Sequence, residues 1–190
     1  MRFCSHCGEG VERRIPAGDH RERFVCASCG MIHYQNPKIV AGCIIDVEGR
    51  ILLCRRGIEP RYGKWTVPAG FMENGESTQN AAARETWEEA RALVDDLRLF
   101  TLFNLPHINQ VYSLFRARLA QPGFDVSDES LETRLFSADE LPWDEMAFPV
   151  VAESLKLYLA DRAGGGFRLH SGNLIRLPGE AVRFRVEMHE

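Results

Sequence analysis

Residues 70–92 read GFMENGESTQNAAARETWEEARA, and the rest of the chain is interpreted around this stretch. It opens as a loop that follows Pro68 and contains two glycines. Ser77 can then cap a helix, and the alanines at 81–83 are strong helix formers. Three acidic residues in this helix fall at spacings i, i+3 and i+4, which places them on one face. They are Glu85, Glu88 and Glu89.

Three like charges on one helix face have two interpretations. Glutamates at these spacings repel each other by roughly 0.2–0.5 kcal/mol even in water, and an acidic stripe is often only a solvated surface. The alternative is a site for a hard divalent cation, because Mg²⁺ prefers carboxylates, water and substrate phosphate oxygens as ligands. The spacing alone does not decide between them.

The stretch as a whole resembles the Nudix box. That pattern runs Gly, five residues, Glu, seven residues, Arg-Glu, an apolar residue, any residue, Glu-Glu, any residue, Gly and an apolar residue. Six of its fixed positions match in register: Gly70, Glu76, Arg84, Glu85, Glu88 and Glu89. Arg91 stands where the family has a glycine that ends the helix, a position that often needs a positive φ. This sequence therefore departs from the family at the helix end, not at the carboxylates.

Size and composition favour one ordinary domain with a small additional module. The chain has 190 residues, of which 45% are hydrophobic, and a net charge of −4 with a pI near 5.9. This acidic balance gives no global attraction for nucleic acid, so we expect no nucleic-acid partner. No stretch is long and apolar enough to span a membrane, and the first residues show no secretory pattern. We therefore expect a cytoplasmic protein without a membrane partner.

The first 35 residues contain two Cys-x-x-Cys pairs, each followed by a glycine: Cys4 with Cys7, and Cys26 with Cys29. Two such turns give tetrahedral ligation of Zn²⁺ by four thiolates, and we predict a structural zinc ribbon over residues 1–35. Two disulfides or a redox dithiol are the alternatives. A reducing compartment disfavours the disulfides, and a redox dithiol would leave the second Cys-x-x-Cys pair unexplained. The protein fills all four positions, so this zinc would leave no open site for catalysis.

Alternation and turn signals predict the remaining elements. The expected strands are 39–46, 51–56, 65–68, 97–103, 110–119 and 132–136; a helical turn is expected at 137–141 and a helix at 148–162. Cys43 and Cys54 lie inside the first two strands, where we expect them to be core residues. Residues 164–190 are interpreted as a C-terminal tail. For residues 36–163 the resemblance implies an α/β fold, the Nudix α/β/α sandwich with a mixed sheet.

The resemblance also implies an activity. Nudix hydrolases cleave a diphosphate between a nucleoside and another group, with Mg²⁺ or Mn²⁺ bound to the box glutamates and to a backbone carbonyl. Here these ligands would be Glu85, Glu88, Glu89 and the carbonyl of Gly70. The metal would neutralise the diphosphate and activate a water molecule, while Arg84 would pair with Glu76 to hold the loop against the helix. Many members of the family are dimers, so a homodimer is an option here.

The general base stays open at this stage. Glu89 lies within the cluster. Glu132 lies about as far past the box as a loop glutamate that helps to bind metal or water in the family. Glu73 is a third candidate.

Substrate contacts are sought among arginines and aromatic residues. Arg55 and Arg56 lie on alternate faces of a strand, so at least one of them should point out of the core. Outside the core it would contact either a diphosphate or only solvent. The aromatic candidates for stacking on a base are Phe71 and Tyr112, together with Tyr62 and Trp65; such residues often belong to the core instead.

A zinc ribbon followed by a Nudix box occurs in NADH pyrophosphatases and in a group resembling the plant FAD/ADP-ribose pyrophosphatases. The segments YQNPK (34–38) and RETWEE (84–89) look like the second group. NADH pyrophosphatases carry a Ser-Gln-Pro-Trp-Pro-Phe-Pro-x-Ser array after the box, which FNLPHI at 103–108 lacks. The expected substrates are FAD, giving FMN and AMP, or ADP-ribose, giving AMP and ribose 5-phosphate. The alternative is NADH, including decapping of NAD-linked RNA.

A different class of protein would use the ribbon to bind nucleic acid and would have lost catalysis. The intact Arg-Glu-x-x-Glu-Glu argues against that loss. Residues 11–23 of the ribbon hold four arginines, Arg13, Arg14, Arg21 and Arg23, but acidic neighbours at 12, 19 and 22 offset them, so no basic stripe forms. Metal-dependent hydrolysis without nucleic acid would separate the two classes.

Overall fold

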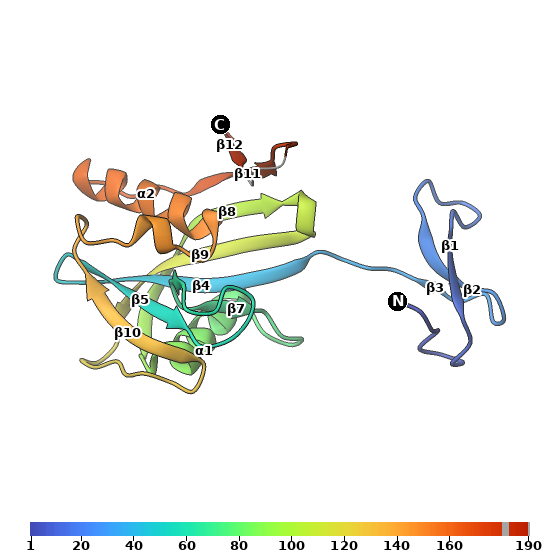
Figure 1. Ribbon diagram of the computed structural model, residues 1–190, viewed down its shortest axis with the longest axis horizontal. Helices are drawn as coiled ribbons and strands as arrows, with labels where there is room; N and C mark the ends of the chain where they lie inside the picture. Colours follow the sequence, from blue (N-terminus) through green and yellow to red (C-terminus); the bar gives the residue numbers. More distant parts are fainter. Residues whose placement is uncertain (180–182, 190) are drawn as a thin grey trace. The chain divides into compact units, whose positions relative to one another are not determined.

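A computed structural model describes residues 1–179 and 183–189 (Figure 1). The chain divides into two compact units, Met1–Pro37 and Lys38–Glu190. In the first unit, β1 (Val11–Arg14), β2 (Arg23–Cys26) and β3 (Ile32–His33) form an antiparallel sheet in the order β1-β2-β3. This unit is too small for an extended core, and apart from Val25 its most buried side chains are two cysteines, Cys4 and Cys26.

The second unit is built on a nine-stranded mixed sheet in the order β10-β5-β4-β9-β8-β11-β12, with β6 paired to β5 and β7 to β4. Its strands are β4 (Lys38–Val47), β5 (Arg50–Arg56), β6 (Trp65–Thr66), β7 (Ala69–Phe71), β8 (Val94–Leu105), β9 (Gln110–Leu119), β10 (Ser130–Phe136), β11 (His170–Arg176) and β12 (Phe184–Met188). The pairs β4–β9 and β8–β11 are parallel, and the other neighbours are antiparallel.

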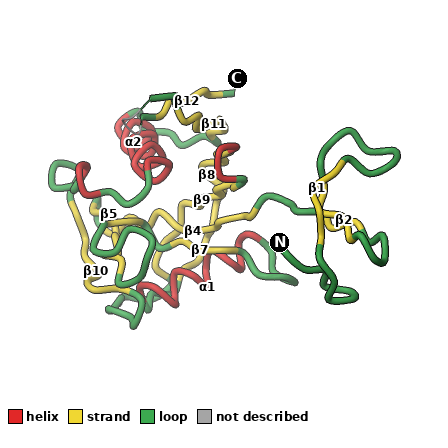
Figure 2. The backbone as a smooth tube through the Cα atoms, turned by 45° about the vertical axis from the view of Figure 1, so that its right-hand side comes forward, coloured by secondary structure: helices red, strands yellow, loops and turns green. Residues whose placement is uncertain are grey.

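Two α-helices cover opposite faces of this sheet, as Figures 1 and 2 show. Helix α1 (Thr78–Ala90) packs small residues such as Ala81 and Ala82 against the face that carries Cys43 and Cys54. Helix α2 (Pro149–Ala163) packs Val151 and its neighbours against the other face. The period of two along each strand separates these two apolar sets. The predicted α/β/α sandwich with a mixed sheet is therefore confirmed, and both cysteines of the strands are core residues.

The short strand β7 can lie close to β4 because residue 42 is a glycine. The register pairs Gly42 with Ala69, and a side chain at position 42 would overlap Ala69 and the carbonyl of Pro68. The loop that opens the box is thus held on the central strand of the sheet, beside the start of α1.

The helix end tolerates the departure from the Nudix pattern. Helix α1 ends at Ala90, and Arg91 adopts the left-handed conformation with φ 50° while its N–H donates to the carbonyl of Trp87. An arginine therefore takes the conformation for which glycine is usually selected, at a cost on the order of 1 kcal/mol.

Two expectations from the sequence differ from the structure. Residues 137–141 form a hydrogen-bonded turn, closed by Ser137 and Glu140, instead of a helical turn; a 3₁₀ helix, η2 (Trp143–Glu145), follows it. The segment 164–190, interpreted as a tail, contributes β11 and β12 to the sheet within its described residues. Figure 1 shows β11 alongside β8.

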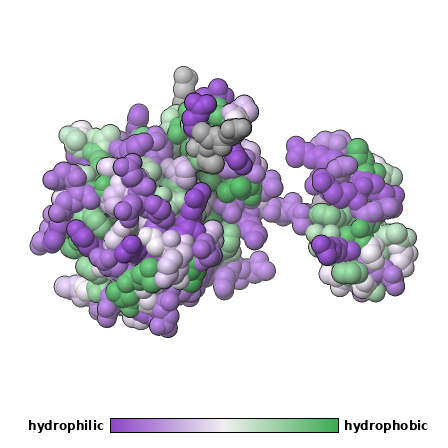
Figure 3. All heavy atoms as spheres, viewed as in Figure 1, coloured by the Kyte–Doolittle hydropathy of each residue, from purple (hydrophilic) through white to green (hydrophobic). Residues whose placement is uncertain are grey.

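The surface of the second unit is mostly hydrophilic on the face drawn in Figure 3, with separate apolar patches. In the described part of the chain, neither helix is long and apolar enough to cross a membrane.

Candidate active site

Helix α1 presents the box carboxylates as their spacing predicts. The Ser77 hydroxyl accepts a 3.1 Å hydrogen bond from the N–H of Asn80 and caps the helix. Glu85 and Glu89 are only 8% and 6% exposed, and both line a cavity together with the more exposed Glu88. A merely solvated acidic face would not bury two of its three carboxylates, so the first interpretation of this face does not hold.

Arg84 ties the loop of the box to the helix. Its guanidinium donates to both carboxylate oxygens of Glu76, at 2.6 and 3.1 Å, and to the carbonyl of Phe71 at 3.0 Å. The same side chain donates to Glu85 and Glu88 at 2.7 Å each. Its hydrogen bonds lower the pKa of Glu76 to about 2. Bidentate pairs of this kind are the strong ones, so the geometry contains the expected contact between loop and helix.

Glu89 has a different partner. Its Oε2 accepts a 3.0 Å hydrogen bond from the backbone N–H of Ala69, in the loop that enters β7. Burial raises the pKa of Glu89 to about 8, and the nearby charges of Glu85 and Glu129 act in the same direction. Burial likewise raises the pKa of Glu85. A cation among these groups would favour their charged forms and relieve their mutual repulsion.

The donor set fits a hard divalent cation, although the glutamates do not converge on one point. Glu85 and Glu88 turn toward Arg84, whereas Glu89 turns toward Ala69. All the donors are oxygens, as Mg²⁺ and Mn²⁺ prefer. In addition, a side chain at Gly70 would overlap the carboxylate of Glu85, which would then have to move.

The cavity has a volume of about 730 Å³, within the range of sites for small molecules. It brings together most of the residues predicted from the sequence: Arg56, Gly70, Phe71, Arg84, Glu85, Glu88, Glu89 and Tyr112, as well as Glu73. Among the predicted charged residues, Arg55 and Glu132 are not among the described residues that line it. The Nε of Arg55 donates to the carbonyl of Gly63 at 3.0 Å, and Glu132 lies opposite Arg55 in the β10–β5 register.

The sequence prediction missed Glu129, which lines the cavity three residues before Glu132. Its backbone carbonyl accepts a 2.8 Å hydrogen bond from the N–H of Gly57. Its flanking serines, Ser127 and Ser130, donate their hydroxyls to the carbonyl of Glu89. Glu129 is therefore held beside the end of α1, and its charge is close enough to raise the pKa of both Glu85 and Glu89.

The substrate side of the cavity combines one buried arginine with apolar residues. Arg56 is 8% exposed, its Nε donates to the carbonyl of Pro60 at 2.8 Å, and its guanidinium lies 5.2 Å from the ring centre of Phe148. Tyr112 is buried in the same cavity. Phe71 is exposed at the cavity, with the Lys38 ammonium 4.7 Å from its ring centre. A buried, fixed guanidinium beside carboxylates suits an anionic ligand that arrives with its own metal ions.

The other two aromatic candidates lie outside this lining. Trp65 is a core residue that packs edge-on against Phe136 with ring centres 4.8 Å apart. Tyr62 is exposed and is not among the described residues that line the cavity.

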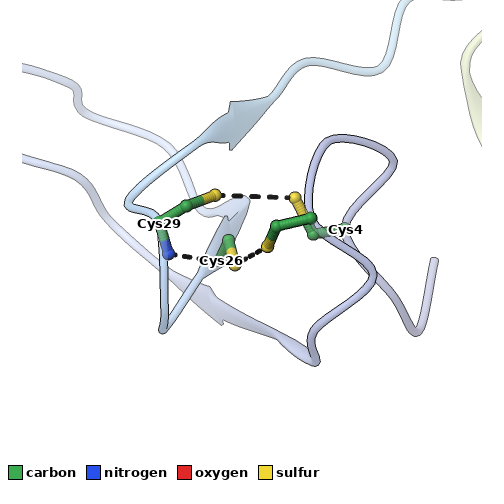
Figure 4. A group of neighbouring side chains, drawn as sticks. Cys4, Cys26 and Cys29 are labelled. Carbon is green, nitrogen blue, oxygen red and sulfur yellow. Dashed lines mark hydrogen bonds between the residues drawn. The ribbon is translucent and has the colours of Figure 1, made fainter.

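The first unit gathers the four predicted cysteines. The sulfur atoms of Cys4, Cys7, Cys26 and Cys29 all lie within 4.8 Å of one another. Figure 4 shows three of them facing one another from the two turns, with Cys4 and Cys29 3.8 Å apart. A tetrahedral zinc with Zn–S bonds of about 2.3 Å separates its sulfurs by about 3.8 Å. Gly8 and Gly30 follow the two pairs with φ 79° and 74°, a backbone conformation that favours glycine.

Backbone N–H groups point at these sulfurs. The N–H of His6 lies 3.4 Å from the sulfur of Cys4, and that of Cys29 lies 3.5 Å from the sulfur of Cys26. His33, which the sequence leaves as surplus to the ligand set, has its Nε2 3.3 Å from the sulfur of Cys4. These donors would stabilise thiolates, which are the form that binds zinc.

A helix of clustered glutamates on a mixed sheet, beside a cavity with a fixed arginine, offers oxygen donors for a divalent cation and a guanidinium for an anionic ligand. Comparison with known families identifies the family. Residues 36–158 match the NUDIX domain, and residues 2–35 match the N-terminal zinc ribbon described as Nudix N-terminal. The chain belongs to the Nudix family.

Three similar proteins are informative. The chain is 30% identical over 168 residues to a protein of Pseudomonas aeruginosa named NAD-capped RNA hydrolase NudC, covering 86% of this chain and 57% of that protein. It is 37% identical over 122 residues to the protein of the same name from Edwardsiella ictaluri, covering 63% and 44%. A crystal structure of a NUDIX hydrolase from Nitrosomonas europaea superposes with a TM-score of 0.87 and 51% identity, covering 91% and 98%. The chain thus spans little more than half the length of the Pseudomonas relative.

Proposed function

We propose that this protein hydrolyses the diphosphate linkage of nucleoside diphosphate derivatives with Mg²⁺ or Mn²⁺ as cofactor. One observation carries this proposal: the three glutamates of α1, Glu129 and the buried Arg56 all line a single cavity. The metal would be held by Glu85, Glu88 and Glu89, with the carbonyl of Gly70 and the Glu129 carboxylate beside them. When bound, it supplies charge neutralisation of the diphosphate and activation of a water molecule.

The protein's own groups then have separate tasks in this proposal. Arg84 fixes the loop and holds the carboxylates of Glu85 and Glu88. The guanidinium of Arg56 binds the diphosphate and is held in place by the Pro60 carbonyl. Tyr112 closes the floor of the cavity, while Phe71 is available at its rim.

The general base is proposed among the glutamates that line the cavity. Glu89 and Glu129 are the leading candidates, Glu73 is a third, and Glu132 lies outside the lining. Replacing each of Glu129 and Glu132 with glutamine is the direct comparison. We expect Glu129→Gln to lower kcat by at least tenfold and Glu132→Gln to leave it nearly unchanged. Loss of rate in the second variant alone would return the role to Glu132.

Two substrate classes have support from different observations. The curated relatives are named for NAD-capped RNA, which favours NADH or an NAD-linked RNA end as substrate and makes a nucleic-acid substrate a real candidate. The support for FAD or ADP-ribose comes from the sequence, because the segment with Leu105, His107 and Ile108, which lines the cavity, lacks the NADH array. We rank FAD and ADP-ribose first.

A panel of FAD, ADP-ribose, NADH, diadenosine polyphosphates and an NAD-capped oligonucleotide, each with Mg²⁺ or Mn²⁺, tests this ranking. The products are identified by mass and the substrates compared by kcat/KM. We expect FAD or ADP-ribose to exceed NADH, with AMP as the common product. A clear preference for NADH or the capped oligonucleotide would reverse the ranking, and absence of any cleavage would refute the proposed function.

For the first unit we propose one structural zinc ion on Cys4, Cys7, Cys26 and Cys29. The support is the cluster of four sulfurs with the separation that tetrahedral zinc requires.

A further inference from the structure

The cavity has a wall that the catalytic proposal does not use, and the hairpin β11–β12 supplies it. Leu174 and Arg176 on β11 and Phe184 on β12 all line the cavity. Leu174 and Arg176 are two residues apart, so they share a face of the sheet. Phe184 lies directly opposite Arg176 in the register and shares that face with both. The pairing of the hairpin, and not chance proximity, thus aims these three side chains into the cavity.

Phe184 also meets an aromatic side chain from another part of the chain. The rings of His107 and Phe184 have centres 5.4 Å apart, with planes inclined by 47°. His107 belongs to the short 3₁₀ helix η1 (Pro106–Ile108) that connects β8 to β9, and it lines the cavity too. The exposed ring of His107 and the half-buried ring of Phe184 therefore meet at this wall, which Arg176 also lines.

The wall lies at a distance from the box. Gly70 lies on β7, and from β7 the sheet runs through β4, β9 and β8 to β11. Four spacings between neighbouring strands amount to about 19 Å. A substrate whose diphosphate lies at the glutamates therefore reaches this wall only with the group at one of its ends.

We propose that Phe184 and His107 form a subsite for a planar ring of the substrate, with the Arg176 guanidinium beside that ring. Aromatic side chains and guanidinium planes are the groups on which nucleobases stack, and each ring of FAD offers such a face. This inference rests on the proposed function and assigns one end of the substrate to the C-terminal hairpin.

The test compares variants of the full-length protein. Phe184→Leu keeps an apolar side chain in the hairpin but removes the ring, while His107→Ala and Arg176→Ala change the other two contacts. Arg185→Ala is the matched control for Arg176→Ala: it removes the same charge from the same hairpin, but its neighbour in sequence is Phe184, so it projects from the opposite face. Melting temperatures show whether each variant is folded.

Two measurements are made on each variant. FAD binding is followed in EDTA by the fluorescence of its isoalloxazine ring, and KM is measured for FAD and ADP-ribose with Mg²⁺. We expect Phe184→Leu and His107→Ala to weaken FAD binding by roughly 5- to 100-fold, and Arg185→Ala to bind as the wild type does. A rise in KM for both substrates assigns the subsite to the adenine that they share. A rise for FAD alone assigns it to the isoalloxazine ring.

If the folded Phe184→Leu, His107→Ala and Arg176→Ala proteins bind FAD with wild-type affinity, the proposed subsite is wrong. If the wild type cleaves the panel while these variants bind FAD normally, only the subsite fails. If the wild type cleaves nothing, the proposed function fails, and the binding measurement in EDTA still decides whether the hairpin holds a ring.

Discussion

The hydroxyl of Ser130 donates a 2.7 Å hydrogen bond to the backbone carbonyl of Glu89. This carbonyl lies in the last turn of α1, where helices leave their carbonyls without partners, and Ser127 donates to the same oxygen at 3.1 Å. Both hydroxyls are buried. The two serines thereby attach the segment that carries Glu129 to the end of the box helix.

Removing these serines tests how the segment is attached. Ser130→Ala should lower the free energy of unfolding by about 1 kcal/mol, since Ser127 still satisfies the carbonyl. Replacing both should cost more than the sum of the single changes, because the carbonyl is then buried without a partner. Urea unfolding without metal measures this difference. Ser137→Ala is the control, because its hydroxyl donates to the exposed Glu140 and not to a buried carbonyl. Simple additivity of the two serines would contradict the shared contact.

A second prediction concerns acid stability. The hydrogen bonds that Glu76 accepts from Arg84 hold the pKa of Glu76 near 2, below the ordinary value of 4.5. A carboxyl group with a lowered pKa stabilises the fold above its unfolded pKa, and this contribution disappears as the pH falls through the folded value. We expect the stability difference between wild type and Glu76→Gln to be full at pH 6 and to shrink from about pH 4.5 to pH 2. A difference independent of pH over this range would show that Glu76 is not held as a charged partner.

The ribbon provides a third prediction. Metal analysis of the purified protein should find one zinc ion per chain, and Cys26→Ser should remove it and loosen residues 1–35, because zinc binding is the folding energy of such modules. Cys43→Ser is the control and should keep the zinc.

With zinc removed by a chelator, four thiols should react with a thiol reagent at neutral pH. Cys43 and Cys54 should stay unreactive until unfolding, since burial raises their pKa to about 11 and about 12. Four free thiols in a metal-free protein as purified would contradict the zinc site.

Local patterns in the sequence were sufficient for the parts of the site that lie close together along the chain. The spacing of the box glutamates fixed their common face, and Ser77 marked the start of their helix. The two Cys-x-x-Cys-Gly pairs gave both turns of the ribbon. In each case the chemistry depends on residues within a few positions of one another, where helix and turn geometry leave few alternatives.

The parts that the sequence did not give depend on contacts between distant segments. Glu129 enters the cavity because it directly precedes β10, which begins at Ser130. Ser127 and Ser130 hold this segment by bonding to the carbonyl of Glu89, which lies 38 and 41 residues earlier in the chain. The resemblance favours Glu132 instead, because its distance past the box is about that of a loop glutamate in the family. The hairpin β11–β12 has no clear periodicity of its own, and it becomes part of the sheet through parallel pairing with β8. Alternation alone likewise could not say that Arg56, rather than Arg55, enters the cavity.

The central claim is that the glutamates of α1 perform catalysis. Glu88→Gln and Glu89→Gln keep the size and helix propensity of each side chain and remove one charge. Loss of an electrostatic contact to the transition state typically costs on the order of 10²–10³ in kcat. Glu153→Gln on α2 is the matched control, because Glu153 is paired with Lys156 and is not among the described residues that line the cavity.

The decisive measurement is kcat/KM of these three variants on the best substrate of the panel, alongside melting temperatures with and without Mg²⁺. We predict a loss of at least about 100-fold for Glu88→Gln and Glu89→Gln, with an unchanged or higher melting temperature in the absence of metal. Mg²⁺ should stabilise the wild type more than either variant, and Glu153→Gln should behave as the wild type. Near wild-type turnover by both box variants would contradict the assignment of the active site.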